Sequence, residues 1–258
     1  PYGYLPTDPG RLREELDRRG IRVSGGGVAG GLHRAESWEQ VLAETRKVSA
    51  LVGELEGRYL IFLPEMYRDI SDGRHLESAQ LDADQWQNLV RGVTRLGKIV
   101  REEYGLSLVF HHHADSHVET QEQTERFLDD TDPEGVSLCL DTGHLAYCGG
   151  DSLALLREYP QRIGCLHLKQ VDPRVLHETQ ENDRSFGQAV ARGVMCEPPL
   201  GAPDLVPILE AADRLDADLF AIVEQDLYPC DPELPLPIAK RTRDYLSRRG
   251  LGPAPRKS

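Results

Sequence analysis

The segment FHHHADSHVET, residues 110–120, holds four of the nine histidines of the chain, with an aspartate and a glutamate. It directly follows the apolar run LSLV, which is typical of a buried strand. Because side chains alternate along a strand, His111 and His113 are expected on one side and His112 on the other. Imidazoles at a strand end are candidates for metal binding or for contacts with substrate. The alternative is that these histidines cap the sheet and bind water.

Three further apolar runs end in a side chain that could bind a cation, at Asp141, His167 and Glu224. Neighbouring parallel strands would bring these two carboxylates and one imidazole within reach of a common point. Mutual repulsion makes such a cluster costly without a cation, and its oxygen and nitrogen donors suit manganese, cobalt, magnesium or zinc. The sequence therefore predicts a divalent metal centre.

Two other charged residues are weaker candidates for substrate contacts. Glu65 follows the apolar run YLIFLP and could contact a substrate hydroxyl, although a solvated loop carboxylate is the alternative. Arg174 belongs to a charged segment after the fifth apolar run, which we interpret as a helix or lid. A solvated helix face is the alternative for this segment.

Short β-rich runs alternate with helical stretches, a pattern typical of a parallel sheet with crossover helices. The predicted strands are residues 21–26, 59–64, 106–112, 136–144, 163–170 and 219–226. The predicted helices are residues 8–20, 38–55, 84–104, 120–129, 152–159, 204–214 and 238–248. Most of these strands carry polar residues at their C-terminal ends, which favours the single active rim of a TIM (β/α)8 barrel over a doubly wound sheet.

An eight-stranded barrel needs two more strands than these runs provide. We expect residues 1–250 to form one barrel domain that lacks the first strand, the first helix and most of the second strand, followed by a disordered tail at 251–258. Such an open barrel would leave strand edges uncovered. The glycine-rich segment 24–31 lacks a complete phosphate-binding motif, so we predict a flexible rim loop there and no nucleotide site.

The composition limits the class of partner. A formal net charge of −13 disfavours nucleic acid and anionic membranes, and favours a small-molecule substrate. The sequence has no apolar run of the roughly 18 residues that a membrane span needs. Its five cysteines form no C-x-x-C pair, which indicates reduced thiols and a cytoplasmic location. A homo-oligomer is compatible with the sequence.

The motifs LCLDTGHLAYCGGD, CLHLKQVD, FAIVEQD and HHHADSHVET together resemble the xylose-isomerase-like barrel superfamily of sugar and sugar-phosphate isomerases and epimerases. Within it, the chain is most similar to the inosose dehydratase family, over residues 1–246. The resemblance implies that Asp141, His167 and Glu224 bind the metal. Mn²⁺ or Co²⁺ is the expected ion, with Zn²⁺ or Mg²⁺ as the alternatives.

The resemblance leaves the fourth metal ligand open. Most relatives have a glutamate at the end of the strand that corresponds to residues 106–112, where this chain has histidine. We expect His113 to replace that glutamate, with His111 or Glu119 as the alternatives. A further departure is Gln170, because relatives of the dehydratase type usually have an aspartate at this position.

The chemistry implied by the resemblance is proton abstraction beside a carbonyl. Glu224, His144 and His113 are candidates for the base and the acid, and Lys169 could polarise the carbonyl or form a salt bridge at the rim. His111, His144 and Lys169 are expected to contact substrate. The expected activity is dehydration of 2-keto-myo-inositol in inositol catabolism. The alternatives are a sugar or sugar-phosphate isomerase or epimerase, and a non-catalytic barrel that binds a sugar or polyol.

Overall fold

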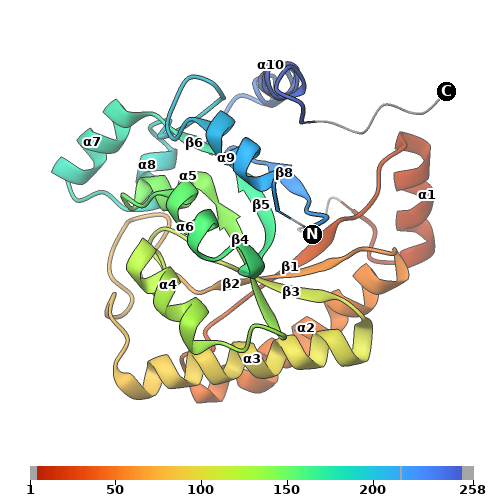
Figure 1. Ribbon diagram of the computed structural model, residues 1–258. Helices are drawn as coiled ribbons and strands as arrows, with labels where there is room; N and C mark the ends of the chain where they lie inside the picture. Colours follow the sequence, from red (N-terminus) through yellow and green to blue (C-terminus); the bar gives the residue numbers. More distant parts are fainter. Residues whose placement is uncertain (1–4, 216, 252–258) are drawn as a thin grey trace.

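The computed structural model describes residues 5–215 and 217–251 (Figure 1). Six strands form one parallel sheet in the order β1-β2-β3-β4-β5-β8. The bounds are β1 Gly25–Gly30, β2 Tyr59–Pro64, β3 Ser107–His111, β4 Val136–Asp141, β5 Ile163–Leu168 and β8 Ala221–Val223. This parallel sheet with crossover helices confirms the predicted (β/α) barrel architecture. Within the described residues, β1 and β8 are the edges of the sheet, and the preceding strands stay a prediction.

Several of the helices pack against the outer face of the curved sheet (Figure 1). Their bounds are α1 Pro9–Arg19, α2 Trp38–Glu54, α3 Ala83–Tyr104, α4 Gln121–Asp130, α5 Thr142–Tyr147, α6 Ser152–Glu158, α7 Pro173–Glu181, α8 Phe186–Val190, α9 Leu205–Ala212 and α10 Pro235–Ser247. All seven predicted helices are present. The charged segment after β5 forms α7 and α8, beside a small antiparallel hairpin of β6 Gln170–Val171 and β7 Met195–Cys196.

The prediction for the glycine-rich segment is wrong, because residues 25–30 form strand β1 and pair with β2. The glycines serve close packing of α2 against this strand. A Cβ atom on Gly26 would lie 2.6 Å from Val48 Cγ1, and one on Gly30 would collide with Val41. A strand that lies this close to a helix has no room for side chains. Close packing therefore outweighs the low strand propensity of glycine.

Alternation along the strands separates the core into an outer and an inner layer. On β4, Leu138 and Leu140 pack outward against the surrounding helices. Cys139 instead contacts Cys165 and Val109 in a small buried cluster inside the curved sheet. The same alternation directs Asp141, two residues after Cys139, to the inner side at the C-terminal end of the strand.

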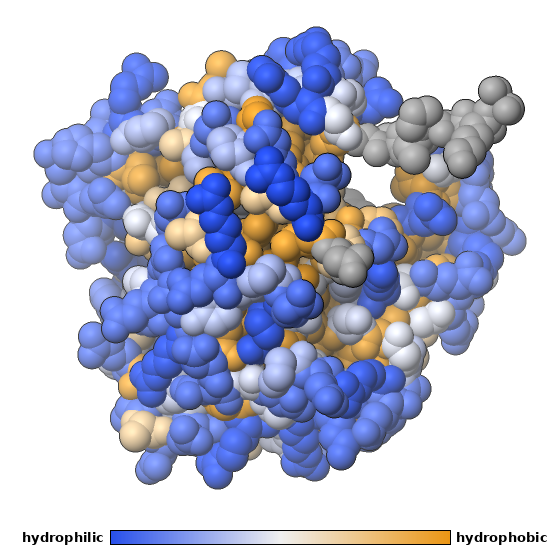
Figure 2. Space-filling view, in the orientation of Figure 1, coloured by the Kyte–Doolittle hydropathy of each residue, from blue (hydrophilic) through white to orange (hydrophobic). Residues whose placement is uncertain are grey.

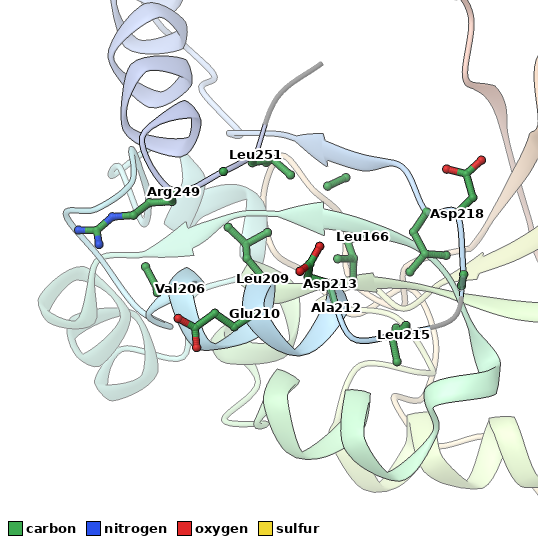
Figure 3. A pocket seen from close by; sticks show the side chains of 14 residues that line it. Leu166, Val206, Leu209, Glu210, Ala212, Asp213, Leu215, Asp218, Arg249 and Leu251 are labelled. Carbon is green, nitrogen blue, oxygen red and sulfur yellow. The ribbon is translucent and has the colours of Figure 1, made fainter. Parts of the chain in front are cut away.

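A cavity of about 540 Å³ lies on the outer side of the sheet (Figure 3). Leu166 of β5 and Leu209 of α9 contribute to its lining. Hydrophobic residues also reach the surface in the middle of the face shown in Figure 2. No residue of the predicted active rim lines this cavity, so it is separate from the candidate site.

Within residues 5–215 and 217–251, no helix has the length and apolar character required to cross a membrane. The predicted tail, residues 251–258, lies outside the described residues except for Leu251. The backbone N–H of Leu251 donates to the carbonyl oxygen of Leu246, and the Leu251 side chain packs on the core. That residues 1–250 form a single domain stays a prediction.

Candidate active site

Strand register assembles the predicted cluster at the C-terminal rim of the sheet. Asp141 ends β4 and is paired in register with His167 of β5. Glu224 follows directly after β8, the other neighbour of β5. Donor atoms of these three residues all lie within 4.8 Å of one another. The structure thus brings together the three residues predicted as metal ligands.

The geometry of His167 fits a cation between these side chains. His167 Nδ1 lies 3.2 Å from Glu224 Oε2 and 3.6 Å from Asp141 Oδ2. Neither ring nitrogen of His167 makes a well-oriented hydrogen bond within the described part of the chain, although the ring is almost fully buried. His167 is thus a buried imidazole without a well-oriented hydrogen bond, and it faces two carboxylates. One imidazole and two carboxylates are a ligand set that binds divalent cations. The residues present therefore fit a metal.

Asp141 is fully buried, and its two carboxylate oxygens contact different groups. Oδ1 accepts hydrogen bonds from the backbone N–H groups of Gly143 and His144 at 2.9 Å, which caps α5 and fixes the carboxylate. Oδ2 remains directed toward the cluster. Burial would raise the pKa of Asp141, but the Lys169 ammonium and the imidazoles around it hold that pKa well below its usual value. A permanently ionised carboxylate is therefore available to a cation.

Lys169 lies in the same buried cluster and is 3% exposed. Its Nζ is 3.3 Å from Asp141 Oδ2, 3.0 Å from Glu224 Oε2 and 3.1 Å from Asp226 Oδ2. These carboxylates outweigh the burial and raise the pKa of Lys169 above its usual range. The structure thus shows the rim salt bridge that was one alternative for Lys169. It also adds Asp226, which the sequence placed on the rim but did not single out as a site residue.

The pKa values of Glu224 and His167 are shifted by the charged side chains around them. Burial would raise the pKa of Glu224, but the close contact with His167 and the charge of Lys169 lower it to about 2. Burial would lower the pKa of His167, but Asp141 and Glu224 raise it to about 9. The field of the two carboxylates thus favours positive charge at this position, whether a proton or a metal carries it.

The structure brings His111, and not His113, next to the metal cluster. His111 is the last residue of β3, and its Nε2 lies 3.3 Å from Asp141 Oδ2. This position favours the alternative, His111, over His113 as the replacement for the glutamate ligand, because the regular alternation of β3 ends at His111. His113 lies beyond the strand, and its backbone N–H donates to the carbonyl oxygen of Val118. His112 is buried on the other side, where its Nε2 accepts the N–H of Asp141.

The rings of His113 and His144 instead lie against each other, with centroids 3.9 Å apart and planes tilted by 38°. His113 is half-buried, and its Nδ1 hydrogen-bonds to the carbonyl oxygen of Ala114 at 2.7 Å. His144 is buried, and its Nε2 lies 3.1 Å from Lys169 Nζ. This imidazole pair adjoins the cluster through His144, a donor atom of which lies within 4.8 Å of donor atoms of His111 and Asp141.

Glu119 does not join the cluster, which removes one alternative for the fourth ligand. Its Oε1 accepts a hydrogen bond from Tyr67 Oη at 2.9 Å, and its Oε2 accepts the N–H of Asp115 at 2.7 Å. Cys148 Sγ is also within 3.9 Å of Oε2. Both carboxylate oxygens are thus engaged in holding the loop after β3 against its neighbours.

Glu65 and Arg174 also lie apart from the cluster. Glu65 forms an ion pair with Arg34 and is 44% exposed at its side chain. Arg174 lies in the first turn of α7, where its side chain is 89% exposed and reaches Asp172. That Arg174 contacts substrate stays a prediction. Its charge belongs to the solvated helix face that was the alternative.

Parallel strands whose C-terminal ends carry a buried His, a buried Asp and a partly exposed Glu define a (β/α)-barrel protein with a candidate metal centre. The family model described as xylose isomerase-like TIM barrel matches residues 2–245, and the chain belongs to this family.

Curated relatives and solved structures agree with this assignment. Inosose dehydratase from Geobacillus kaustophilus (strain HTA426) is 32% identical over 265 residues, covering 95% of this chain and 83% of that enzyme. Inosose dehydratase from Geobacillus thermodenitrificans (strain NG80-2) is 36% identical over 163 residues, covering 63% of this chain and 54% of that enzyme. This second match spans about half the length of the relative. The crystal structure of the IOLI protein with a zinc atom has a TM-score of 0.69 at 18% identity, covering 94% of this chain and 82% of that one.

Proposed function

We propose that the protein is a divalent-metal-dependent hydro-lyase that removes water from a keto-cyclitol of the 2-keto-myo-inositol type. The observation that carries this proposal is the convergence of Asp141, His167 and the partly exposed Glu224 on one point, with His111 beside them. The similarity to inosose dehydratases over 95% of the chain supports the substrate class. The activity would belong to inositol catabolism.

In this proposal Asp141, His167 and Glu224 hold the cation, and His111 takes the place of the glutamate found in relatives. A bound divalent cation supplies Lewis-acid stabilisation of the negative charge that develops on the substrate carbonyl oxygen. Carboxylate and imidazole donors support Mn²⁺ or Co²⁺ as the resident ion, with Zn²⁺ or Mg²⁺ as the alternatives.

His113 is the base that we propose. The carbonyl oxygen of Ala114 fixes a proton on His113 Nδ1, so Nε2 carries the lone pair that accepts a proton. Burial lowers the pKa of His113 to about 3, which makes the ring a weak base and its protonated form a strong acid toward the leaving hydroxyl group. His113 takes the proton from the carbon beside the substrate carbonyl, and the released electron pair forms the enolate. The enolate then expels the β-hydroxyl group, which takes that proton from His113 and leaves as water. One imidazole thus balances both proton transfers.

Lys169 and His144 position the substrate in this scheme. Lys169 stays an ammonium among three carboxylates, so it donates hydrogen bonds and does not serve as the base. Its Nζ contacts His144, whose ring lies against that of His113. Lys169 and His144 therefore offer hydrogen bonds to substrate oxygens next to the proposed base.

The test is a proton NMR time course of 2-keto-myo-inositol in heavy water, with the 258-residue chain and Mn²⁺. We expect a dehydrated diketone to form. Asp141→Asn should lower the rate at least roughly 100-fold, the upper end of the loss when a mere supporting partner of a metal site is removed. Arg174→Ala is the matched control and should retain the rate. Deuterium uptake beside the carbonyl without loss of water would instead indicate an epimerase or isomerase.

We also propose a cytoplasmic location, supported by five free cysteine thiols. Fractionation of the producing cells would test this location. Whether the chain forms a homo-oligomer stays a prediction, and light scattering after size-exclusion chromatography would test it.

A further inference from the structure

A second group of potential ligands lies outside the candidate active site, at His33, Glu77 and His117. His33 follows β1, Glu77 lies between β2 and α3, and His117 lies between β3 and α4 (Figure 1). His33 Nε2 is 3.2 Å from Glu77 Oε2, and His117 Nε2 is 3.1 Å from Glu77 Oε1. Both imidazoles are 2% exposed. Three loops thus bring two buried imidazoles onto one carboxylate.

The hydrogen bond of His117 shows why this arrangement needs a cation. His117 Nδ1 lies 3.1 Å from the carbonyl oxygen of Ala79, which can only accept a hydrogen bond. The proton of a neutral His117 is therefore on Nδ1, and the lone pair of Nε2 faces the carboxylate of Glu77. Two electron-rich atoms 3.1 Å apart repel unless a proton or a metal lies between them. An imidazole whose second nitrogen is held by a carbonyl oxygen is the usual form of a metal-bound histidine.

His33 presents the same type of lone pair. Arg34 Nη1 lies 2.7 Å from His33 Nε2, and a guanidinium can only donate, so this nitrogen is an acceptor. The same nitrogen faces Glu77 Oε2. His33, His117 and Glu77 therefore direct three electron pairs toward one region. Two imidazoles and one carboxylate are a donor set found at zinc sites that keep further positions open.

Arg34 supplies the positive charge in this structure. Its Nη1 donates to Glu77 Oε1 and Oε2 at 3.1 Å and 3.0 Å, in addition to His33. Arg34 also forms an ion pair with Glu65 on its other side, and 32% of its side chain is exposed. The guanidinium could therefore turn toward Glu65 and keep an anionic partner when a metal replaces it at Glu77.

We propose that His33, Glu77 and His117 form a second divalent-cation site, selective for a zinc-type ion and in competition with Arg34. It shares no residue with the Asp141, His167 and Glu224 cluster. The side chain of Glu77 is 26% exposed, which gives an ion a route from solvent. A bound ion would join the loops that follow β1, β2 and β3, and would leave positions for water or a substrate oxygen.

The test is the zinc stoichiometry of the 258-residue chain, by elemental analysis after equilibrium dialysis and by titration calorimetry. We expect two equivalents for the unaltered protein. Glu77→Gln should weaken the second equivalent by at least roughly 10–100-fold, because even loss of a supporting partner has this effect at metal sites. Glu224→Gln should weaken only the other equivalent. Glu197→Gln, which removes a surface carboxylate paired with Arg241, is the matched control and should change neither.

Arg34→Met keeps the test decisive if the Glu77 variant folds poorly. This variant removes the competing cation and leaves all three ligands, so zinc should bind the second site more tightly than in the unaltered protein. Circular dichroism checks that each variant is folded. The proposal is overturned if the unaltered protein binds a single equivalent and Arg34→Met adds none, or if Glu77→Gln leaves the binding of both equivalents unchanged.

Discussion

The two ligand clusters of this protein are positioned in different ways. Asp141 and His167 are register partners on adjacent strands, so the sheet itself fixes their separation. His33 and Glu77 come from loops, and their relation depends on side-chain contacts with Arg34. Strand pairing thus fixes the first, strand-end cluster, whereas the second, loop cluster depends on side-chain contacts between loops. In both clusters a side-chain cation already contacts the carboxylates, Lys169 in the first and Arg34 in the second, so a bound metal would have to compete with it.

The charge of Lys169 is the largest expected determinant of stability at the strand-end cluster. Lys169→Met leaves the buried carboxylate of Asp141 without its ammonium partner, and removal of one partner of a buried pair costs about 3–5 kcal/mol. We expect this loss in the free energy of unfolding without metal, measured by urea denaturation. Added Mn²⁺ should restore part of it.

Lys47→Met is the matched control for this prediction, because Lys47 pairs with Glu44 at the surface and both side chains are more than half exposed. Its expected effect is below about 1 kcal/mol. An equal loss in the free energy of unfolding for Lys169→Met and Lys47→Met would show that the buried ion pairs of Lys169 stabilise the protein no more than a surface ion pair does.

Metal addition should separate the two clusters through stability. At a free metal concentration of 100 times Kd, each occupied site adds about 2.7 kcal/mol to the free energy of unfolding. With zinc, Glu224→Gln should lose one such increment and Glu77→Gln the other. Unfolding titrations with and without metal measure both. If either variant lost both increments, the two clusters would form one coupled site.

Arg174→Ala should have the smallest effect. Its exposed side chain contacts only the neighbouring Asp172 among the ion pairs of the described residues. We expect the free energy of unfolding to change by less than about 0.5 kcal/mol and turnover to stay the same. A large loss of turnover with an unchanged fold would restore Arg174 as a substrate contact and show that α7 closes over the rim.

Sequence reasoning succeeded where regular strands carry the side chains. Asp141 and His167 could be placed because each ends an apolar run, and alternation with parallel register then fixes the side on which they lie. It could not place the end of β3, because nothing in the run of three histidines shows that the strand ends at His111. It also failed for β1, because tight packing of α2 on glycine cannot be seen from propensity.

The loop cluster had no sequence signal of its own. His33 and Glu77 are separated by 44 positions and Glu77 and His117 by 40. No strand period relates such residues, and only the tertiary positions of three loops bring them together. The same holds for Glu119, whose engagement by Tyr67 depends on a neighbouring loop.

The central claim is that the strand-end cluster dehydrates a keto-cyclitol with the help of a divalent cation. The most direct measurement is the rate of diketone formation from 2-keto-myo-inositol, followed by NMR with chelator-treated protein before and after Mn²⁺ is restored. We predict no product after chelation, recovery when Mn²⁺ returns, and no recovery for Asp141→Asn. Equal rates with and without metal, or no product under any condition from a folded protein that binds Mn²⁺, would contradict the claim.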